Sequence, residues 1–92
     1  MIQSFIHKGL KRFFETGSKA GIQPPHANRL RLILTVLNVA QDIADIDKPG
    51  LKLHALKGDR KGDWAVSVSG NWRVTFQFKN GDAYLLNYED YH

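Results

Sequence analysis

Residues 64–88, which read WAVSVSGNWRVTFQFKNGDAYLLNY, decide the fold of this chain. Apolar and polar residues alternate in three successive runs, and alternate side chains of a strand project from the same face of a sheet. Ser69-Gly70-Asn71 predicts a tight turn after the first run, and Asn80-Gly81 after the second is the strongest hairpin signal in the sequence. The stretch therefore predicts an antiparallel meander of three strands.

The two faces of this predicted sheet differ in character. Trp, Val and Phe side chains fill one face, and we expect Tyr84, Leu86 and Tyr88 of the last run to share it. This face needs a cover of helices. The other face is expected to be open to solvent or to a ligand. Its polar residues are Ser67, Ser69, Arg73, Thr75 and Gln77.

The residues before the meander predict two short strands and two helices. Residues 1–6 are expected to form a first strand, and residues 51–55 alternate as a second strand would. Residues 8–16 have helical spacing and are followed by Gly17, the usual residue for the left-handed position after a helix. Two prolines suit the start of a second helix over residues 24–40. Its core stripe is Leu30, Ile33, Leu34 and Leu37.

The second predicted helix is more apolar than an ordinary surface helix. Leu32, Val36 and Val39 lie outside its core stripe and leave only a narrow polar seam. We expect the helix to be wedged between the first helix and the sheet. The alternative is that a partner protein covers part of it.

The pattern as a whole predicts a single α+β domain over residues 1–92, with two N-terminal helices packed on one face of a small, mainly antiparallel sheet. Of the 92 residues, 42% are hydrophobic, and no apolar run reaches the roughly 20 residues of a membrane helix. The first residues lack the apolar core of a secretion signal. Cysteine is absent, which excludes disulfide frameworks and thiolate zinc sites and fits a cytoplasmic protein.

The charge of the chain is modest, but its distribution is uneven. Thirteen Lys and Arg residues against nine Asp and Glu residues give a net charge of +4. The basic residues gather in stretches 8–12 and 52–61, and a separated basic surface favours binding to a polyanion. The alternative is a mixed, solvated surface. The candidates for contact with nucleic acid are Lys8, Lys11, Arg12, Arg60 and Lys61.

Two stretches carry the groups that a metal-free ribonuclease needs. Residues 87–92, NYEDYH, place acids, phenols and an imidazole side by side, and residues 53–58, LHALKG, carry a histidine and a lysine. One group must take the 2′-hydroxyl proton, another must protonate the leaving oxygen, and cations must stabilise the phosphate. If the last strand folds beside the others, we expect these side chains to converge. They are His54, Lys57, Arg73, Asp90, Tyr91 and His92.

Taken singly, each of these residues has a plainer interpretation. A lone histidine in a strand is usually an ordinary polar residue, a lysine before a glycine is usually solvated, and Arg73 beside Trp72 could simply stack. Other chemistries have weaker support. Gly58 and Gly62 lack the Lys-Ser/Thr of a phosphate loop, neither a His-x-x-x-His nor an Asp-x-Asp pair offers a strong metal site, and no serine has a nucleophile-elbow context. We therefore expect neither a metal nor a cofactor.

Blocks along nearly the whole chain are similar to those of the HigB toxins, a branch of the RelE/ParE superfamily of bacterial toxin–antitoxin proteins. Only the stretch 40–48 matches weakly. The similar blocks are FIHKGLK at 5–11, FFETG at 13–17, LHALKGDR at 53–60, WAVSVSGNWRVTFQF at 64–78, GDAY at 81–84 and YEDYH at 88–92.

The resemblance implies a RelE-like fold and a ribosome-dependent endonuclease that cuts messenger RNA in the decoding site. It implies as partners the ribosome, the messenger RNA and a HigA-type helix-turn-helix antitoxin, the last in a heteromeric complex. It also implies roles for the candidate residues. His54 and His92 would be acid and base in either order, Lys57 and Arg73 would hold the scissile phosphate, Asp90 and Tyr91 would orient the nucleotide or the His92 ring, and Asn71 would contact the substrate.

Two other functions remain open from the sequence. One is a protein-binding toxin like the ParE branch, which acts on DNA gyrase without cutting RNA. The other is a basic RNA-binding module without chemistry. The nuclease differs from both in that it needs His54 and His92 for growth arrest.

Overall fold

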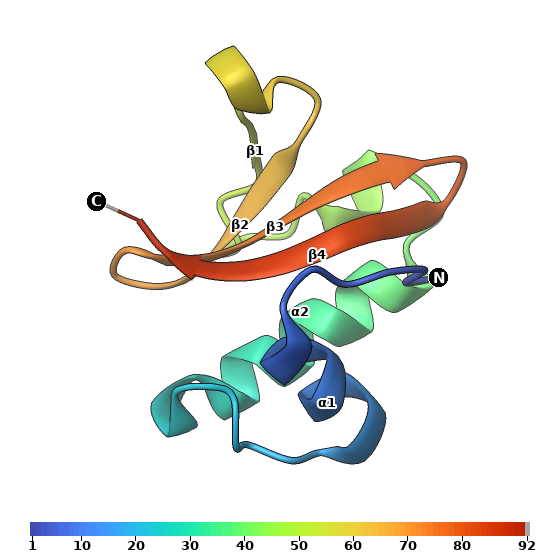
Figure 1. Cartoon of the computed structure of the whole chain (residues 1–92). Coiled ribbons are helices and arrows are strands. Elements are labelled where there is room, and N and C mark those ends of the chain that lie inside the picture. Colours follow the sequence, from blue (N-terminus) through green and yellow to red (C-terminus); the bar gives the residue numbers. More distant parts are fainter. Residues whose placement is uncertain (92) are drawn as a thin grey trace.

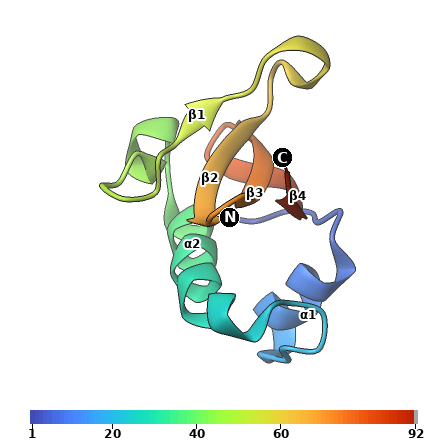
Figure 2. The same cartoon turned by 90° about the vertical axis from the view of Figure 1, so that its left-hand side faces the viewer.

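A computed structural model of the protein describes residues 1–91. Within these residues the chain forms two α-helices on one side of a four-stranded antiparallel sheet, whose strands follow the order β1-β2-β3-β4 (Figures 1 and 2). The α+β prediction is confirmed. The elements are α1 (Lys8–Thr16), η1 (Pro24–His26), α2 (Ala27–Val39), η2 (Ile43–Ile46), β1 (His54–Ala55), η3 (Gly58–Arg60), β2 (Trp64–Ser69), β3 (Trp72–Lys79) and β4 (Asp82–Asp90), where η marks a 3-10 helix.

Helix α1 has the predicted bounds because both of its ends are capped. The Nδ1 atom of His7 accepts a hydrogen bond of 3.0 Å from the Leu10 backbone N–H, which satisfies one of the free donors at the start of the helix. Gly17 adopts φ 79° and donates its N–H to the Phe13 carbonyl. Leu10 and Phe13 are buried in the hydrophobic core, whereas Phe14 is 39% exposed.

Helix α2 begins at Ala27, because the two prolines form the 3-10 turn η1 in front of it. All four residues of the predicted core stripe are buried. The expectation that the whole helix is wedged in place is wrong for one side, since Leu32 is 51% and Val39 is 66% exposed. That side of α2 stays open to solvent in the isolated chain.

The meander has the predicted turns, with Asn80 at φ 52° and Gly81 at φ 83° between β3 and β4. The register shifts by one residue after the Gln77–Tyr84 pair, because β4 makes a bulge at Leu85, which adopts φ 56°. The prediction that Tyr84 lies on the core face is therefore wrong. Ala83 is fully buried on that face instead, together with Leu86 and Tyr88.

Residues 1–6 do not form the predicted strand. They run parallel to β4 through two isolated bridges, Ile2 with Ala83 and Phe5 with Leu86. Between these bridges the bulge turns the Leu85 N–H to the Ser4 hydroxyl at 2.9 Å, so a continuous ladder of backbone bonds does not form.

The predicted strand over residues 51–55 is reduced to the two residues of β1. Lys52 adopts φ 54°, which lies outside the strand region, so the alternation of side chains is broken there. Leu51 is buried in the core, while both residues of β1 are exposed. No helix within residues 1–91 is long and apolar enough to cross a membrane.

Candidate active site

The polar face of the sheet, on the side away from the helices, carries two of the candidate residues. Directly paired residues of antiparallel strands project from the same face. His54 and Arg73 therefore share this face. The rows that carry them are His54–Ala65–Thr75–Asn87 and Ser67–Arg73–Glu89.

Arg73 is the best-defined cation of the polar face. Its guanidinium carbon lies 3.9 Å from the centre of the Tyr91 ring, and its Nη2 donates to the Glu89 carboxylate at 3.2 Å. The Tyr91 N–H donates to the Asn71 carbonyl at 3.0 Å, which anchors the ring beside the β2–β3 turn. The Arg73 side chain is 12% exposed, and its Nε is buried without a hydrogen-bond partner among residues 1–91. The stack thus fixes a positive group beneath an aromatic ring.

Arg60 closes the centre of the polar face. Its Nη1 lies 3.0 Å from Glu89, its Nη2 donates to the Thr75 hydroxyl at 3.2 Å, and its Nε lies 3.7 Å from Asp63. Gln77 in turn donates to Asp63 at 3.1 Å. The expectation of an open polar face is therefore wrong at its centre, where Thr75 is only 2% exposed. The physical reason is that the η3 loop folds back over the strands.

His54 is held in one orientation at the outer edge of the sheet. Its Nδ1 lies 2.9 Å from the Lys52 carbonyl oxygen. A carbonyl can only accept a hydrogen bond, so Nδ1 must carry the proton and the neutral ring keeps Nε2 as its acceptor. The exposed Lys57 lies just beyond β1, immediately before η3. An imidazole with a free Nε2 and a neighbouring cation can move a proton next to a phosphate.

The remaining members of the predicted set are placed differently. Asp90 is paired with Trp72, so it projects from the face opposite to Arg73. Asn71 is exposed in the β2–β3 turn and reaches the site through its carbonyl bond to Tyr91. His92 lies outside the described residues. The structure therefore gathers part of the predicted set on one face and leaves Asp90 on the other.

The chain also matches a known protein family. A family model of the RelE-like toxin of the type II toxin–antitoxin system HigB matches residues 3–92. The chain belongs to the HigB-like toxin family. Membership in a toxin–antitoxin family implies an antitoxin partner.

Two curated relatives of this HigB-like chain cover its full length. It is 51% identical over 92 residues to the protein named Endoribonuclease HigB of Proteus vulgaris, and the match covers 100% of both chains. It is 32% identical over 94 residues to the protein named Toxin HigB-1 of Vibrio cholerae serotype O1, with 100% of this chain and 98% of the relative covered.

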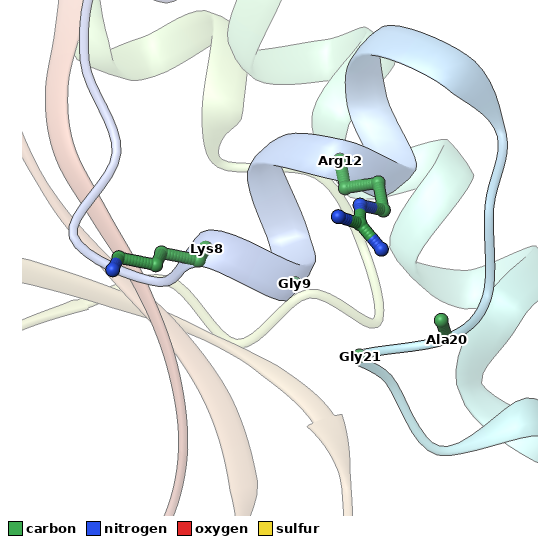
Figure 3. A pocket seen from close by; sticks show the side chains of 5 residues that line it. All are labelled: Lys8, Gly9, Arg12, Ala20 and Gly21. Atoms are coloured by element: carbon green, nitrogen blue, oxygen red, sulfur yellow. The ribbon is translucent and has the colours of Figure 1, made fainter.

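The basic residues of this HigB-like toxin lie on two separate sides. Lys8, Lys11 and Arg12 are exposed on α1, on the helical side of the sheet (Figure 2), whereas Arg60 and Lys61 belong to the loop over the polar face. Figure 3 shows that Lys8 and Arg12 flank the place where the backbones of α1 and the following loop meet. There they line a pocket of about 280 Å³ with Gly9, Ala20 and Gly21.

Sequence reasoning missed the acidic members of the polar face. Glu89 and Asp63 hold the two arginines of the site, yet neither was among the candidate residues. A charged residue inside the YEDYH block, next to Asp90, was the available signal for Glu89. Its pairing with Arg73 depends on the β4 bulge, which alternation alone does not reveal.

Proposed function

We propose that this chain is an endoribonuclease toxin that cleaves messenger RNA in the ribosomal A site and so arrests translation and growth. The observation that carries the proposal is the stack of Arg73 beneath Tyr91 on the sheet face that also holds His54. A cation for the phosphate, a ring for the base and an imidazole for the proton lie on one surface. The name of the Proteus vulgaris relative, Endoribonuclease HigB, supports RNA cleavage by this chain as well.

The reaction needs no metal. The ribose 2′-oxygen attacks the adjacent phosphorus, the bond from phosphorus to the 5′-oxygen breaks, and the products are a 2′,3′-cyclic phosphate and a 5′-hydroxyl. One histidine takes the 2′-hydroxyl proton and another gives a proton to the 5′-oxygen, which suits imidazoles because their unperturbed pKa is about 6.5. His54 and His92 fill these roles. His54 acts through Nε2, because its Nδ1 is bonded to the Lys52 carbonyl.

The other candidate residues bind and orient the substrate. Lys57 and Arg73 neutralise the charge that develops on the phosphate oxygens. Tyr91 stacks on the nucleotide or on Arg73, Asp90 orients the His92 ring, and Asn71 contacts the base from the β2–β3 turn.

The ribosome supplies the positioning that this small site lacks. Holding the phosphate and the 2′-hydroxyl in line accounts for much of the lowering of a reaction barrier. We place the toxin in the cytoplasm, as a single domain whose partner is a HigA-type helix-turn-helix antitoxin. The residues that contact the ribosome are Lys8, Lys11, Arg12 and Lys61.

Mapping transcript ends after induced expression tests this function. The wild-type chain should produce discrete cuts within codons of translated messages, while His54→Ala and His92→Ala should produce none. Lys79→Ala, which removes an exposed charge at the hairpin end of β3, is the matched control and should cut as the wild type does. A different result would be that the wild-type chain arrests growth without cutting transcripts and that His54→Ala still arrests growth. That result would assign the chain to the gyrase-binding type of toxin.

A further inference from the structure

We propose that Arg60 and Glu89 are positioning residues: their ion pair holds the segment with His54 and Lys57 in place relative to Arg73. The proposal rests on the proposed function of the polar face and adds two residues to it. In this role Arg60 binds other residues of the protein. Its position in a basic stretch of the sequence had instead suggested a contact with nucleic acid.

The guanidinium of Arg60 makes several polar contacts within the protein. Each of its three nitrogens lies near an oxygen, and these oxygens belong to two strands and to the turn before β2. Glu89 belongs to β4, Thr75 to β3, and Asp63 to the turn before β2. Because two carboxylates already neutralise its charge and both Nη atoms donate within the protein, Arg60 is a weaker phosphate ligand than a solvated arginine. Arg60 is only partly exposed, whereas the next residue, Lys61, is exposed.

The segment that Arg60 ties down is otherwise weakly attached. Strand β1 has only two residues paired with β2, and it is the outer strand of the sheet. Between β1 and Arg60 the chain is held by the Leu56 N–H bond to the Asp63 carbonyl at 2.9 Å. Arg60 also donates its backbone N–H to the Lys57 carbonyl at 3.3 Å. The position of Lys57 therefore depends on where the Arg60 side chain is fixed.

The Arg60–Glu89 ion pair acts as a tether between the η3 loop and the sheet, and Glu89 is its end on the sheet. Its carboxylate lies 3.0 Å from Arg60 and 3.2 Å from Arg73, so it joins the η3 loop to the stacked guanidinium. Glu89 is directly opposite Arg73 in the β3–β4 register, which makes the contact part of the sheet itself. One negative charge between two guanidiniums also reduces their mutual repulsion. The two ends of the candidate site, His54 with Lys57 and Arg73 with Tyr91, are linked through this single carboxylate.

A positioning role and a direct contact with RNA predict different kinetics. Loss of a phosphate contact weakens substrate binding in a salt-dependent way, and the effect does not depend on Glu89. Loss of positioning slows the chemical step with bound substrate, because small displacements of reacting groups cost on the order of 10²-fold in rate. If Arg60 and Glu89 act through one ion pair, the rate losses caused by mutating each of them are also non-additive.

The experiment is single-turnover cleavage of messenger RNA on ribosomes by Arg60→Gln, Glu89→Gln, the double variant and Arg60→Lys. We expect each Gln variant to slow the saturated rate by about 10- to 100-fold with little change in the half-saturating ribosome concentration. The double variant should be no slower than the slower single variant, and Arg60→Lys should recover part of the rate. Lys61→Gln removes the same charge from the next residue, and it should raise the half-saturating concentration without slowing the saturated rate.

A second readout does not depend on activity. In NMR spectra of the protein alone, Arg60→Gln and Glu89→Gln should both shift the amide signals of His54 and Lys57, and Lys61→Gln should not. These spectra also show whether each variant is folded. If Arg60→Gln fails to fold, Arg60→Lys carries the comparison.

Three results would overturn the positioning role. One is an Arg60→Gln variant that cleaves at the wild-type saturated rate, another is a double variant whose losses multiply, and the third is unshifted His54 and Lys57 signals. A wild-type chain that cuts no RNA on ribosomes would instead refute the proposed function, and the NMR comparison would still decide whether the tether exists.

Discussion

Arg73 is restrained in two directions at once. The Tyr91 ring fixes the plane of its guanidinium, and the Glu89 carboxylate fixes its rotation within that plane. A side chain that is already ordered loses less conformational entropy when it binds a phosphate. The Arg73 side chain is only 12% exposed, and its Nε has no hydrogen-bond partner among residues 1–91. The contacts with Tyr91 and Glu89 offset the cost of burying this group.

Substitution of Tyr91 separates the effect of its ring from that of its hydroxyl. Tyr91→Ala removes the stack on Arg73, and we expect a loss of about 3- to 30-fold in the saturated cleavage rate, the size of a cation–π contact. Tyr91→Phe keeps the ring and should stay within about threefold of wild type. Single-turnover cleavage on ribosomes measures both variants. Equal losses in the two would assign the role to the hydroxyl.

At the scale of single residues, the sequence predicts which groups share a face but not what they contact. Alternation within β3 places Arg73 on the polar side, as the structure has it. The orientation of the His54 ring was beyond prediction, because it depends on the carbonyl of Lys52, whose φ of 54° interrupts the alternation.

At the scale of elements, one extra residue in β4 determines the composition of the site. Counting back from the Asn80-Gly81 hairpin without a bulge would pair Arg73 with Tyr88. The bulge at Leu85 shifts the register by one, so Glu89 faces Arg73 and Tyr88 enters the core. Because of this shift, simple alternation along β4 predicted the wrong face for Tyr84. For the same reason it did not predict the ion pairs of Glu89. The helices were easier to predict, because the residues that bound them are adjacent in sequence: Gly17 ends α1, and the two prolines precede α2.

The cap of α1 should make the stability of the fold depend on pH. Burial lowers the pKa of His7 below its usual value of 6.5, and its neutral Nδ1 accepts the Leu10 N–H. The unfolded chain therefore binds more protons on this residue than the folded chain as the pH falls through 6.5. The contribution of the cap is fully present above about pH 6.5 and is lost as the pH falls toward the lowered pKa of the folded protein.

Urea unfolding at pH 7.5 and pH 5.5 measures this contribution. Wild type should lose more free energy of unfolding between the two pH values than His7→Asn, because asparagine caps a helix without titrating. At pH 7.5, His7→Ala should cost about 1 kcal/mol. An identical pH dependence in wild type and His7→Asn would contradict the role of the imidazole.

The contact between α1 and the loop after it tolerates no side chain. A Cβ atom on Gly9 would lie 2.5 Å from the Gly21 carbonyl oxygen, and both partners are backbone. Although alanine is the better helix former, we expect Gly9→Ala to lower the free energy of unfolding by about 1–3 kcal/mol. Urea unfolding tests this, with Lys11→Ala on the exposed side of α1 as the control within about 0.5 kcal/mol of wild type. A Gly9→Ala variant as stable as that control would show that the loop moves aside freely.

At the scale of the whole molecule, the sheet separates two basic surfaces. The α1 surface, formed by Lys8, Lys11 and Arg12, lies on the helical side of the sheet (Figure 2). The candidate active site lies on the opposite face, as the strand register shows. Binding to a large polyanion such as the ribosome can use both, whereas chemistry uses only one. The family assignment came from blocks spread over the chain, so it did not depend on the register or the β1 length that local patterns predicted wrongly.

Neutralising the α1 surface should therefore weaken binding without slowing the reaction. In the triple variant Lys8→Gln, Lys11→Gln, Arg12→Gln, we expect a lower affinity for ribosomes and a shallower dependence of that affinity on salt, by roughly one unit of slope per lost phosphate contact. The cleavage rate at saturating ribosomes should stay at the wild-type value. A salt dependence equal to that of wild type would remove α1 from the ribosome interface.

The pairing of residues 2–5 with residues 83–86 has a consequence for synthesis. A chain made from its first residue onward cannot complete this contact until β4 has emerged, and β4 also supplies the carboxylate that orders both arginines. An unfinished copy that lacks β4 thus also lacks the ordered polar face on which the proposed cleavage of RNA depends.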